Sequence, residues 1–186
     1  WGAQLPQQLY CSVGGDNRLG GRLAAQHLLG LGRRRIAFLG DAALPEVLHR
    51  REGFWEALRD AGLKPEPALE LAAPFEVGAA QQQIQDFMRE HPELDAVLAC
   101  SDLLALQAIQ ALRALGRRVP QDVAVTGYDD MPLAAYCDPP LSSVHQPVAE
   151  AGAELVRALL QLMDGHSVPP LTLPVHLVAR ASAPAR

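Results

Sequence analysis

The stretch AVLACSDLLALQAIQALRALGRRVPQDVAVTGYDD, residues 96–130, decides the fold class. Residues 96–99 form a short continuous apolar run, which is typical of a strand buried on both faces. Ser101 follows as a helix-capping residue, and apolar side chains then recur at helical spacing up to Gly116. A second apolar run at 123–126 completes the unit. A strand, a helix and a strand in this order predict a parallel pair joined by a crossover helix.

The same alternation extends over the rest of the chain and predicts an α/β fold, a doubly wound parallel sheet covered on both faces. The glycine-rich segment 14–21 precedes a helix, and we expect its glycines to serve a tight turn and close helix packing. Expected strands lie at residues 9–13, 36–39, 68–71, 96–99, 123–126 and 171–178, and expected helices at 17–31, 45–61, 77–91, 102–115 and 148–163.

Length and composition indicate a globular protein of one domain or slightly more. The chain has 186 residues, of which 49% are hydrophobic and 20% charged. Its net charge of −5 disfavours nucleic-acid binding by this chain alone. Three cysteines leave one unpaired, which argues for a reducing compartment. No apolar run approaches a membrane span, the N-terminus lacks a signal-peptide pattern, and the chain opens without an initiator Met.

Catalytic and metal-binding motifs are poor. The chain contains no P-loop, and segment 14–21 lacks the Gly-x-Gly-x-x-Gly spacing of dinucleotide sites. Its six histidines show no metal-ligand spacing with cysteine. A cysteine nucleophile paired with a histidine stays open, although no local signature supports it. We therefore expect a protein that is not an enzyme and that uses no metal or cofactor.

Polar side chains gather where the expected strands end. In an open parallel sheet, ligands bind outside the carboxyl ends of the strands. Carboxylates accept from vicinal hydroxyls, a guanidinium donates a fork, and an aromatic ring covers an apolar face, so these groups suit a polar small molecule. The alternative for each residue alone is a helix cap or a solvated turn. The residues are Glu46 and Arg50 after 36–39, Ser101 and Asp102 after 96–100, and Tyr128, Asp129 and Asp130 after 123–126.

The order of the motifs resembles one family over nearly the whole chain. The motifs are DNRLGG (16–21), AAQHL (24–28), IAFLG (36–40), RxxGF (50–54), SDxxA (101–105), VPxDVAV (119–125), GYDD (127–130), PLSSVxQP (140–147) and RxS (180–182). Together they resemble the effector domain of lactose-repressor (LacI/GalR) type transcription regulators. The resemblance implies two doubly wound lobes, like those of periplasmic sugar-binding proteins, with an effector in the cleft. It also implies a cytoplasmic homodimer that binds operator DNA through an N-terminal helix-turn-helix.

The resemblance assigns roles to five residues. Arg50 and Asp129 occupy the family's effector-binding arginine and aspartate positions. Ser101 stands where many members have a ligand-contacting Asn, and its shorter side chain reaches less far. Phe75 matches the family's covering aromatic, with spacing two residues short. Glu46 lies one helical turn before Arg50, and we expect it to orient Arg50 rather than to touch the ligand.

The resemblance further implies a chain truncated at its N-terminus, because no helix-turn-helix precedes residue 1. Residues 13–146 plus 170–186 match the second, C-terminal lobe. Residues 1–12 are expected to be a strand leading in from the missing first lobe, and 147–164 a helix of that lobe. We expect this helix to pack against another copy or to fold onto its own lobe. It would otherwise expose the apolar stripe of Ala153, Val156, Leu160 and Met163.

The function implied is binding of a small effector, with a sugar as the default and purines as alternatives. Effector binding would close the lobes and change how a dimer presents its DNA-binding heads. A second hypothesis is a sugar-binding protein of a transport system, which predicts an upstream signal peptide instead of a helix-turn-helix. A third is a small hydrolase or transferase that uses Asp129 or Asp130 as base, which predicts turnover.

Overall fold

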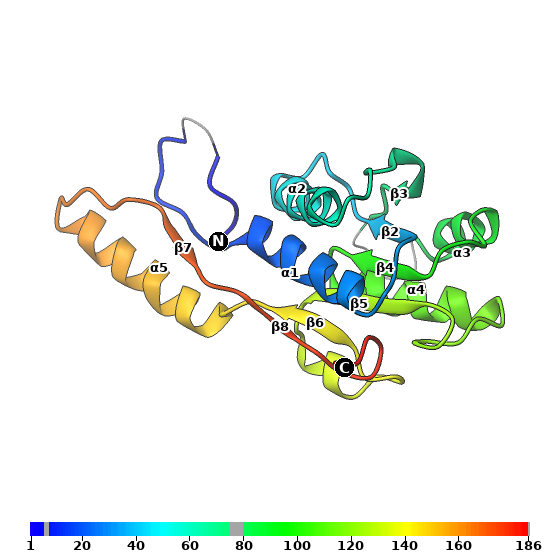
Figure 1. Ribbon diagram of the computed structural model, residues 1–186. Helices are drawn as coiled ribbons and strands as arrows, with labels where there is room; N and C mark the ends of the chain where they lie inside the picture. The colour runs from blue at the N-terminus through cyan, green and yellow to red at the C-terminus, as the bar shows by residue number, and fades with distance from the viewer. Residues whose placement is uncertain (6–7, 75–79, 186) are drawn as a thin grey trace.

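The main sheet of the protein has six strands in the order β3-β2-β4-β5-β6-β8 (Figure 1). The computed structural model describes residues 1–5, 8–74 and 80–185. The first five strands are parallel, and β8 is antiparallel to β6. This confirms the α/β class with a parallel sheet. The strands are β2 (Ile36–Leu39), β3 (Glu70–Leu71), β4 (Ala96–Ala99), β5 (Ala124–Asp129), β6 (Ser142–His145) and β8 (His176–Val178).

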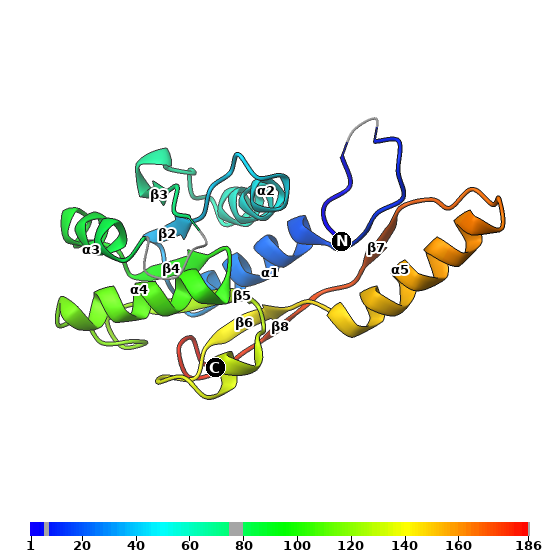
Figure 2. The same cartoon turned by 180° about the vertical axis from the view of Figure 1, so that it is seen from behind.

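Helices cover both faces of this sheet, with α1 and α2 on one face and α3 and α4 on the other (Figures 1 and 2). The side chain of Asp16 caps α1 by accepting a hydrogen bond from the Leu19 amide at 2.9 Å. Pro45 opens α2, where its missing amide donor is not needed. The helices are α1 (Asn17–Gly30), α2 (Pro45–Asp60), α3 (Gln81–Glu90), α4 (Asp102–Ala114) and α5 (Val148–Met163), with short 3₁₀ turns at Pro67–Leu69 and Pro132–Ala135.

Close packing of α1 on α2 depends on glycine. A Cβ built on Gly21 would lie 1.9 Å from the Arg50 carbonyl oxygen, and one on Gly53 would lie 1.9 Å from the Arg18 carbonyl oxygen. Each helix therefore presents a glycine to the backbone of the other, as expected for Gly21. This contact fixes the middle of α2, which carries Arg50, against α1.

A second, two-stranded sheet lies apart from the main one and carries α5 (Figures 1 and 2). It consists of β1 (Val13–Gly15) and β7 (Leu171–Leu173) in parallel register. Its small apolar cluster is separate from the main core and contains Val13, Ala151, Leu155 and Leu173. The chain thus has one large core and a minor one.

Three of the expected strands need correction. The strand expected at 9–13 is wrong because Leu9 is fully exposed and pairing begins only at Val13. That pairing continues through Gly14 and Gly15, so these glycines form strand instead of the expected tight turn. The run 171–178 is two strands, because Pro174 separates a segment that pairs with β1 from one that pairs with β6. At 68–71 only two residues are strand, since Pro67–Leu69 is a 3₁₀ turn.

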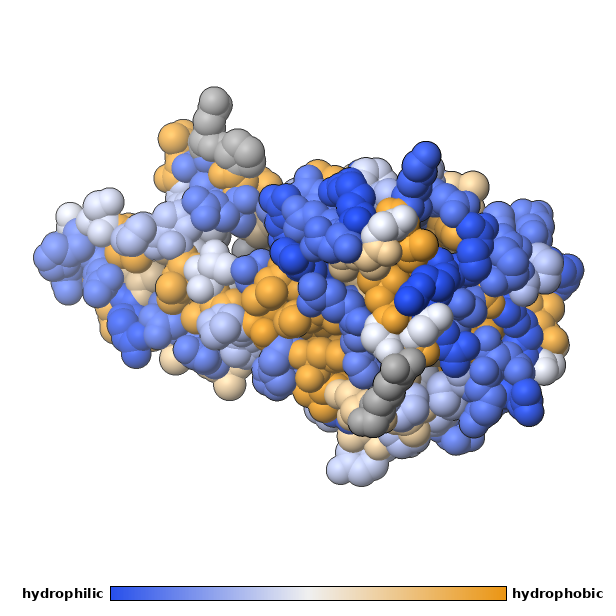
Figure 3. All heavy atoms as spheres, in the orientation of Figure 1, coloured by the Kyte–Doolittle hydropathy of each residue, from blue (hydrophilic) through white to orange (hydrophobic). Residues whose placement is uncertain are grey.

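The outward face of α5 is apolar and exposed. Val156, Leu160 and Met163 have exposed fractions of 59%, 55% and 74%, so the helix does not fold onto its own lobe with this face. In the orientation of Figure 1, apolar surface gathers in the middle of the molecule over α1 and β8, while α5 shows scattered apolar atoms among hydrophilic ones (Figure 3). Within the described residues, no helix is both long and apolar enough to cross a membrane.

Candidate functional site

Arg50 is the best-fixed polar group at the carboxyl edge of the main sheet. It stands on α2 and is only 6% exposed. Its Nε donates to Asn17 Oδ1 at 2.8 Å, and its Nη1 donates to the Cys100 carbonyl oxygen at 2.5 Å. The guanidinium carbon lies 3.7 Å from the ring centroid of Tyr128, a cation–π contact. A buried cation held from three sides is oriented before any ligand arrives.

Asp129 ends β5 and faces the positive charge of Arg50. Burial raises the pKa of its carboxyl group, and the charge of Arg50 and a hydrogen bond from Gln146 oppose that rise. The hydrogen bond runs from Gln146 Nε2 to Asp129 Oδ1 at 2.6 Å. The backbone of Asp129 has φ of 103°, which is unusual for a residue other than glycine. The structure thus brings the two predicted effector residues to one edge of the sheet.

The other three predicted effector residues are Ser101, Glu46 and Phe75. Two of them, Ser101 and Glu46, make contacts different from those of Arg50 and Asp129. Ser101 is buried, and its Oγ accepts from the Leu104 amide at 3.2 Å as the cap of α4. Glu46 Oε1 accepts from the Ala3 amide at 2.9 Å, and the structure, which describes both residues, shows no hydrogen bond or ion pair between Glu46 and Arg50, so the expected orienting role stays a prediction. Burial favours a higher pKa for Glu46, yet the amide bonds and the charge of Arg50 lower it. Phe75 lies outside the described residues.

Sequence reasoning did not select Asn17 or Gln146 as site residues. Asn17 is buried at the start of α1, where its Nδ2 donates to the Gly15 carbonyl and its Oδ1 holds Arg50. Gln146 directly follows the residue of β6 that pairs with Asp129. Only the strand pairing reveals that neighbourhood, because the two residues are 17 positions apart.

A cleft of about 390 Å³ opens beside this edge, between the N-terminal segment, the small sheet and the start of α1. Asn17 lines it, but neither Arg50 nor Asp129 does, so the cleft adjoins the buried pair without containing it. Polar side chains predominate among its other lining residues. They are Gln4, Asp16, Arg18, His49, Glu52 and Thr172, together with Ala3, Leu5 and Gly15.

The site lacks the features of covalent or metal chemistry. Burial raises the pKa of Cys100 to about 12, so its thiol stays protonated. Asp130 forms an ion pair with Arg180 at 2.7 Å and a hydrogen bond with His145 Nδ1 at 3.0 Å, which makes it a poor free base. Among the residues that the structure describes, no group of three or more potential ligands is placed to hold a metal. A fixed cation, a carboxylate and an amide suit recognition of a polar molecule.

Comparison with known proteins agrees with this arrangement. The family model for the periplasmic binding protein-like domain matches residues 25–183. The transcriptional regulator CelR of Thermobifida fusca is 39% identical over 181 residues, covering 96% of this chain and 53% of its own. The ribose operon repressor of Haemophilus influenzae is 36% identical over 147 residues, 78% of this chain and 44% of its own.

Solved structures give the same result. The CelR–cellobiose complex superimposes with a TM-score of 0.90 at 38% identity, covering 96% of this chain and 55% of the other. The lac repressor dimer bound to operator and the anti-inducer ONPF superimposes with a TM-score of 0.85 at 31% identity. This match covers 94% of this chain and 53% of the lac repressor chain. The chain spans about half the length of these relatives, which are described as transcriptional regulators and not as enzymes. The chain belongs to the LacI-type family of transcriptional regulators, and it corresponds to part of their periplasmic-binding-protein-like effector domain.

Proposed function

We propose that this chain supplies the C-terminal half of an effector site that binds a sugar and thereby controls a transcriptional regulator. The observation that carries the proposal is Arg50, a buried guanidinium held by Asn17 and Cys100 beside the carboxylate of Asp129. A sugar offers hydroxyls that donate to a carboxylate and accept from a guanidinium at the same time. Because Arg50 is already oriented, little conformational entropy is lost when the ligand binds.

Cellobiose is the first effector to try, because CelR has been solved in complex with it and is similar over 96% of this chain. Ribose is a second sugar to test, since two ribose operon repressors are among the relatives. Purine bases remain the alternative class. They would use the same Asp129 and Arg50 but would need more aromatic cover than a sugar does.

Residues 1–12 and 147–164 fit the first lobe of the effector domain, of which this chain holds only these segments. We assign residues 13–146 plus 170–186 to the C-terminal lobe, and residues 1–12 and 147–164 to the first lobe. The exposed outer stripe of α5 and its separate apolar cluster support a division between α5 and the main sheet. Because that cluster also contains Val13 of β1 and Leu173 of β7, these two short strands group with α5, and the boundaries fit better after Gly15 and Leu173. In the complete protein, effector binding between the lobes would shift a closed–open equilibrium of a homodimer, and a separate N-terminal domain would bind operator DNA.

A thermal-shift panel tests the site assignment. The complete protein that carries this chain is screened with cellobiose, ribose and purine bases, alongside the variants Arg50→Ala and Asp129→Asn. We expect at least one sugar to raise the melting temperature of the wild type and of Asp86→Asn, an exposed acid on α3 used as control. The two site variants should show no rise. A sugar that stabilises them as well as the wild type contradicts the assignment.

A further inference from the structure

The loop that follows β5 is held in an unfavourable conformation. Asp129 and Asp130 both have positive φ, at 103° and 52°. Side chains other than glycine rarely adopt this region, so the surrounding structure must stabilise the loop. Asp129 is the carboxylate of the proposed effector site. Whatever holds the loop therefore determines where that carboxylate points.

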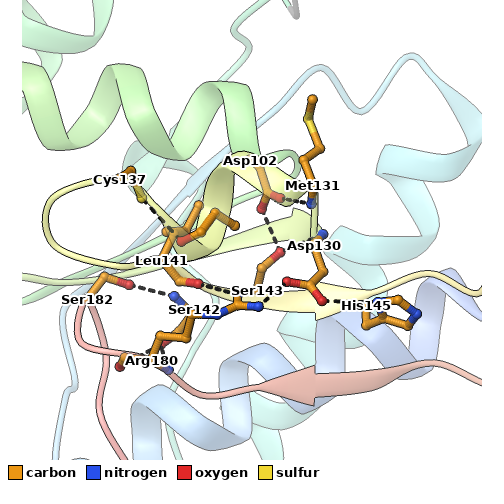
Figure 4. A network of polar contacts seen from close by, with 11 residues as sticks. Asp102, Asp130, Met131, Cys137, Leu141, Ser142, Ser143, His145, Arg180 and Ser182 are labelled. Carbon is orange, nitrogen blue, oxygen red and sulfur yellow. Dashed lines mark hydrogen bonds and ion pairs between the residues drawn. The ribbon is translucent and has the colours of Figure 1, made fainter.

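A single buried carboxylate holds the two amides that follow Asp129 (Figure 4). Asp102, at the start of α4, is 1% exposed. Its Oδ2 accepts from the Met131 amide at 2.7 Å, and its Oδ1 accepts from Ser143 Oγ at 2.5 Å. Ser143 Oγ in turn accepts from the Asp130 amide at 3.0 Å. Both amides thus depend on Asp102, one directly and the other through one hydroxyl.

The strand beside the carboxylate makes room for it. A Cβ built on Gly127 would lie 2.3 Å from Asp102 Oδ1 and 3.2 Å from its Cα. Only glycine therefore allows β5 to pass so close to Asp102. The GYDD motif begins with this glycine, so the approach and the loop are built into one short segment of sequence.

The neighbouring acid is directed elsewhere. Asp130 forms an ion pair with Arg180, from the segment after β8, and a hydrogen bond with His145 of β6 (Figure 4). Asp129 receives its hydrogen bond from Gln146 instead. The two carboxylates of the loop therefore have different partners, Gln146 for Asp129, and Arg180 and His145 for Asp130.

We propose that Asp102 is a positioning residue of the effector site, whose ionised carboxylate fixes the backbone after Asp129 and so directs the Asp129 side chain. The inference rests on the proposed effector role of Asp129. Asp102 itself is too buried to touch the ligand and acts only through the loop.

Asp102 also makes the loop sensitive to pH. Burial raises its pKa to about 6, the bonds from Ser143 and Met131 oppose the rise, and the charges of Asp129 and Asp130 add to it. Other titratable groups nearby are Arg180 and His145, both paired with Asp130, and Cys137 on the loop before β6. A protonated carboxyl turns one acceptor into a donor, so the loop loses support as the pH falls through about 6.

Amide exchange without ligand tests the first half of the inference. In the complete protein near neutral pH, Asp102→Asn should speed exchange of the Asp130 and Met131 amides by about tenfold or more. Ser143→Ala should speed that of Asp130 alone, and it serves as a second variant if Asp102→Asn folds poorly. Asp86→Asn should change neither. If the exchange rates of the Asp130 and Met131 amides in both variants stay within about twofold of the wild-type rates, the proposed role of Asp102 is overturned.

Calorimetric titration with cellobiose tests the second half. At a pH of about 7.5, Asp102→Asn should weaken the affinity by about tenfold or more, and Ser143→Ala by less. Between about pH 7.5 and 5, the wild type should lose more affinity than Asp102→Asn, whose remaining slope reflects Asp129. If Asp102 only stabilised the fold, the sugar affinities of the wild type and of Asp102→Asn would change in parallel with pH. Parallel affinity profiles therefore contradict the inference. If the wild type binds no sugar at all, the proposed function fails, whereas the exchange result still decides for or against Asp102.

Discussion

Arg50 and Asp129 show why charge alone does not define a site residue. The chain has 16 Lys and Arg and 21 Asp and Glu, and most of those that form ion pairs do so at the exposed surface. Arg50 differs because its donors are directed to Asn17 and Cys100 within the fold. Asp129 differs because it is half-buried and feels the positive charge of Arg50. The fixed direction of the Arg50 guanidinium and the partial burial of the Asp129 carboxylate distinguish these two side chains from the surface charges.

Replacement of Arg50 by Lys separates the effect of the fixed hydrogen-bond directions of the guanidinium from the effect of its positive charge. Lysine keeps the positive charge but has no planar fork, so it cannot donate to Asn17 and Cys100 and still face a ligand. We expect sugar affinity to fall by about 10- to 100-fold, the equivalent of about 1.5–3 kcal/mol for a hydrogen bond to a charged group. The measurement is a calorimetric titration. Affinity equal to that of the wild type would show that only the charge matters.

Asp102 predicts a pH dependence of stability. Its pKa in the folded protein is about 6, above the ordinary value of 3.8, so the folded state favours the protonated form. Stability from this group is therefore greatest at low pH and is lost as the pH rises from about 4 to above 6. The full difference is about 3 kcal/mol at 1.36 kcal/mol per pKa unit.

Urea unfolding of wild type and Asp102→Asn over this pH range measures the effect. The free energy of unfolding of the wild type, relative to the variant, should decrease by about 2–3 kcal/mol from about pH 4 to about pH 7. Two curves that run parallel over the whole range would contradict a raised pKa. If the predicted decrease is observed, the carboxylate that directs Asp129 also lowers the stability of the protein near neutral pH.

At the scale of single residues, the sequence predicted that Arg50 and Asp129 lie at one edge of the sheet, because residues that follow buried strands gather there in a parallel sheet. Their binding of an effector stays a prediction. Sequence reasoning did not select Asn17 and Gln146 because their roles depend on strand pairing and helix packing. It did not predict the Ala3 amide as the partner of Glu46, because helical spacing shows a shared helix face but not which group approaches that face.

Among the elements, the contact between α1 and α2 is the tightest and the most readily tested. Gly21→Ala would place a methyl group 1.9 Å from the Arg50 carbonyl oxygen, which neither backbone can avoid without moving. We expect a loss of about 1–3 kcal/mol in the free energy of unfolding and weaker sugar binding, because Arg50 moves with α2. Chemical denaturation measures the first effect and calorimetry the second.

Gly30→Ala is the matched control on the same helix. A Cβ there meets nothing within 4 Å, so alanine should stabilise the protein by about 0.5–1 kcal/mol through helix propensity. Equal effects of the two substitutions would mean that backbone entropy, and not close packing, explains the glycine at position 21.

Elements were predicted well where burial is continuous and poorly where it is not. β2, β4 and β5 lie in the main core and were found from apolar runs alone. β1 contains two glycines, so no apolar run marks it, and β3 lies within the strand expected at 68–71 but has only two residues. The run at 171–178 alternates as one strand does, and only the two different partners of β7 and β8 separate it.

For the whole molecule, α5 is the part whose surroundings remain to be tested. If its exposed face meets the first lobe, Leu160→Glu should destabilise the complete protein by about 2–5 kcal/mol, because it buries an unpaired charge. The neighbouring exposed Gln161→Glu should cost less than about 0.5 kcal/mol. Thermal unfolding of both variants measures the difference. Equal stability would contradict the assignment of residues 147–164 to the first lobe.

The segment upstream of residue 1 in the complete protein tests whether effector binding is coupled to DNA binding. A regulator predicts a basic helix-turn-helix there, and a transport protein predicts a signal peptide. The net charge of −5 belongs to this chain alone and is compatible with a DNA-binding domain elsewhere in the protein. Gel-shift binding of the complete protein to its own upstream DNA, with and without sugar, measures the coupling.

The central claim is that Asp129, opposite Arg50, binds a sugar effector, and one measurement tests it most directly. Cellobiose is titrated calorimetrically into the complete protein, as wild type, as Asp129→Asn and as the control Asp86→Asn. We predict saturable binding to wild type and control, and affinity lower by about 10- to 100-fold or more for Asp129→Asn. Binding to Asp129→Asn within about twofold of the wild type would contradict the claim.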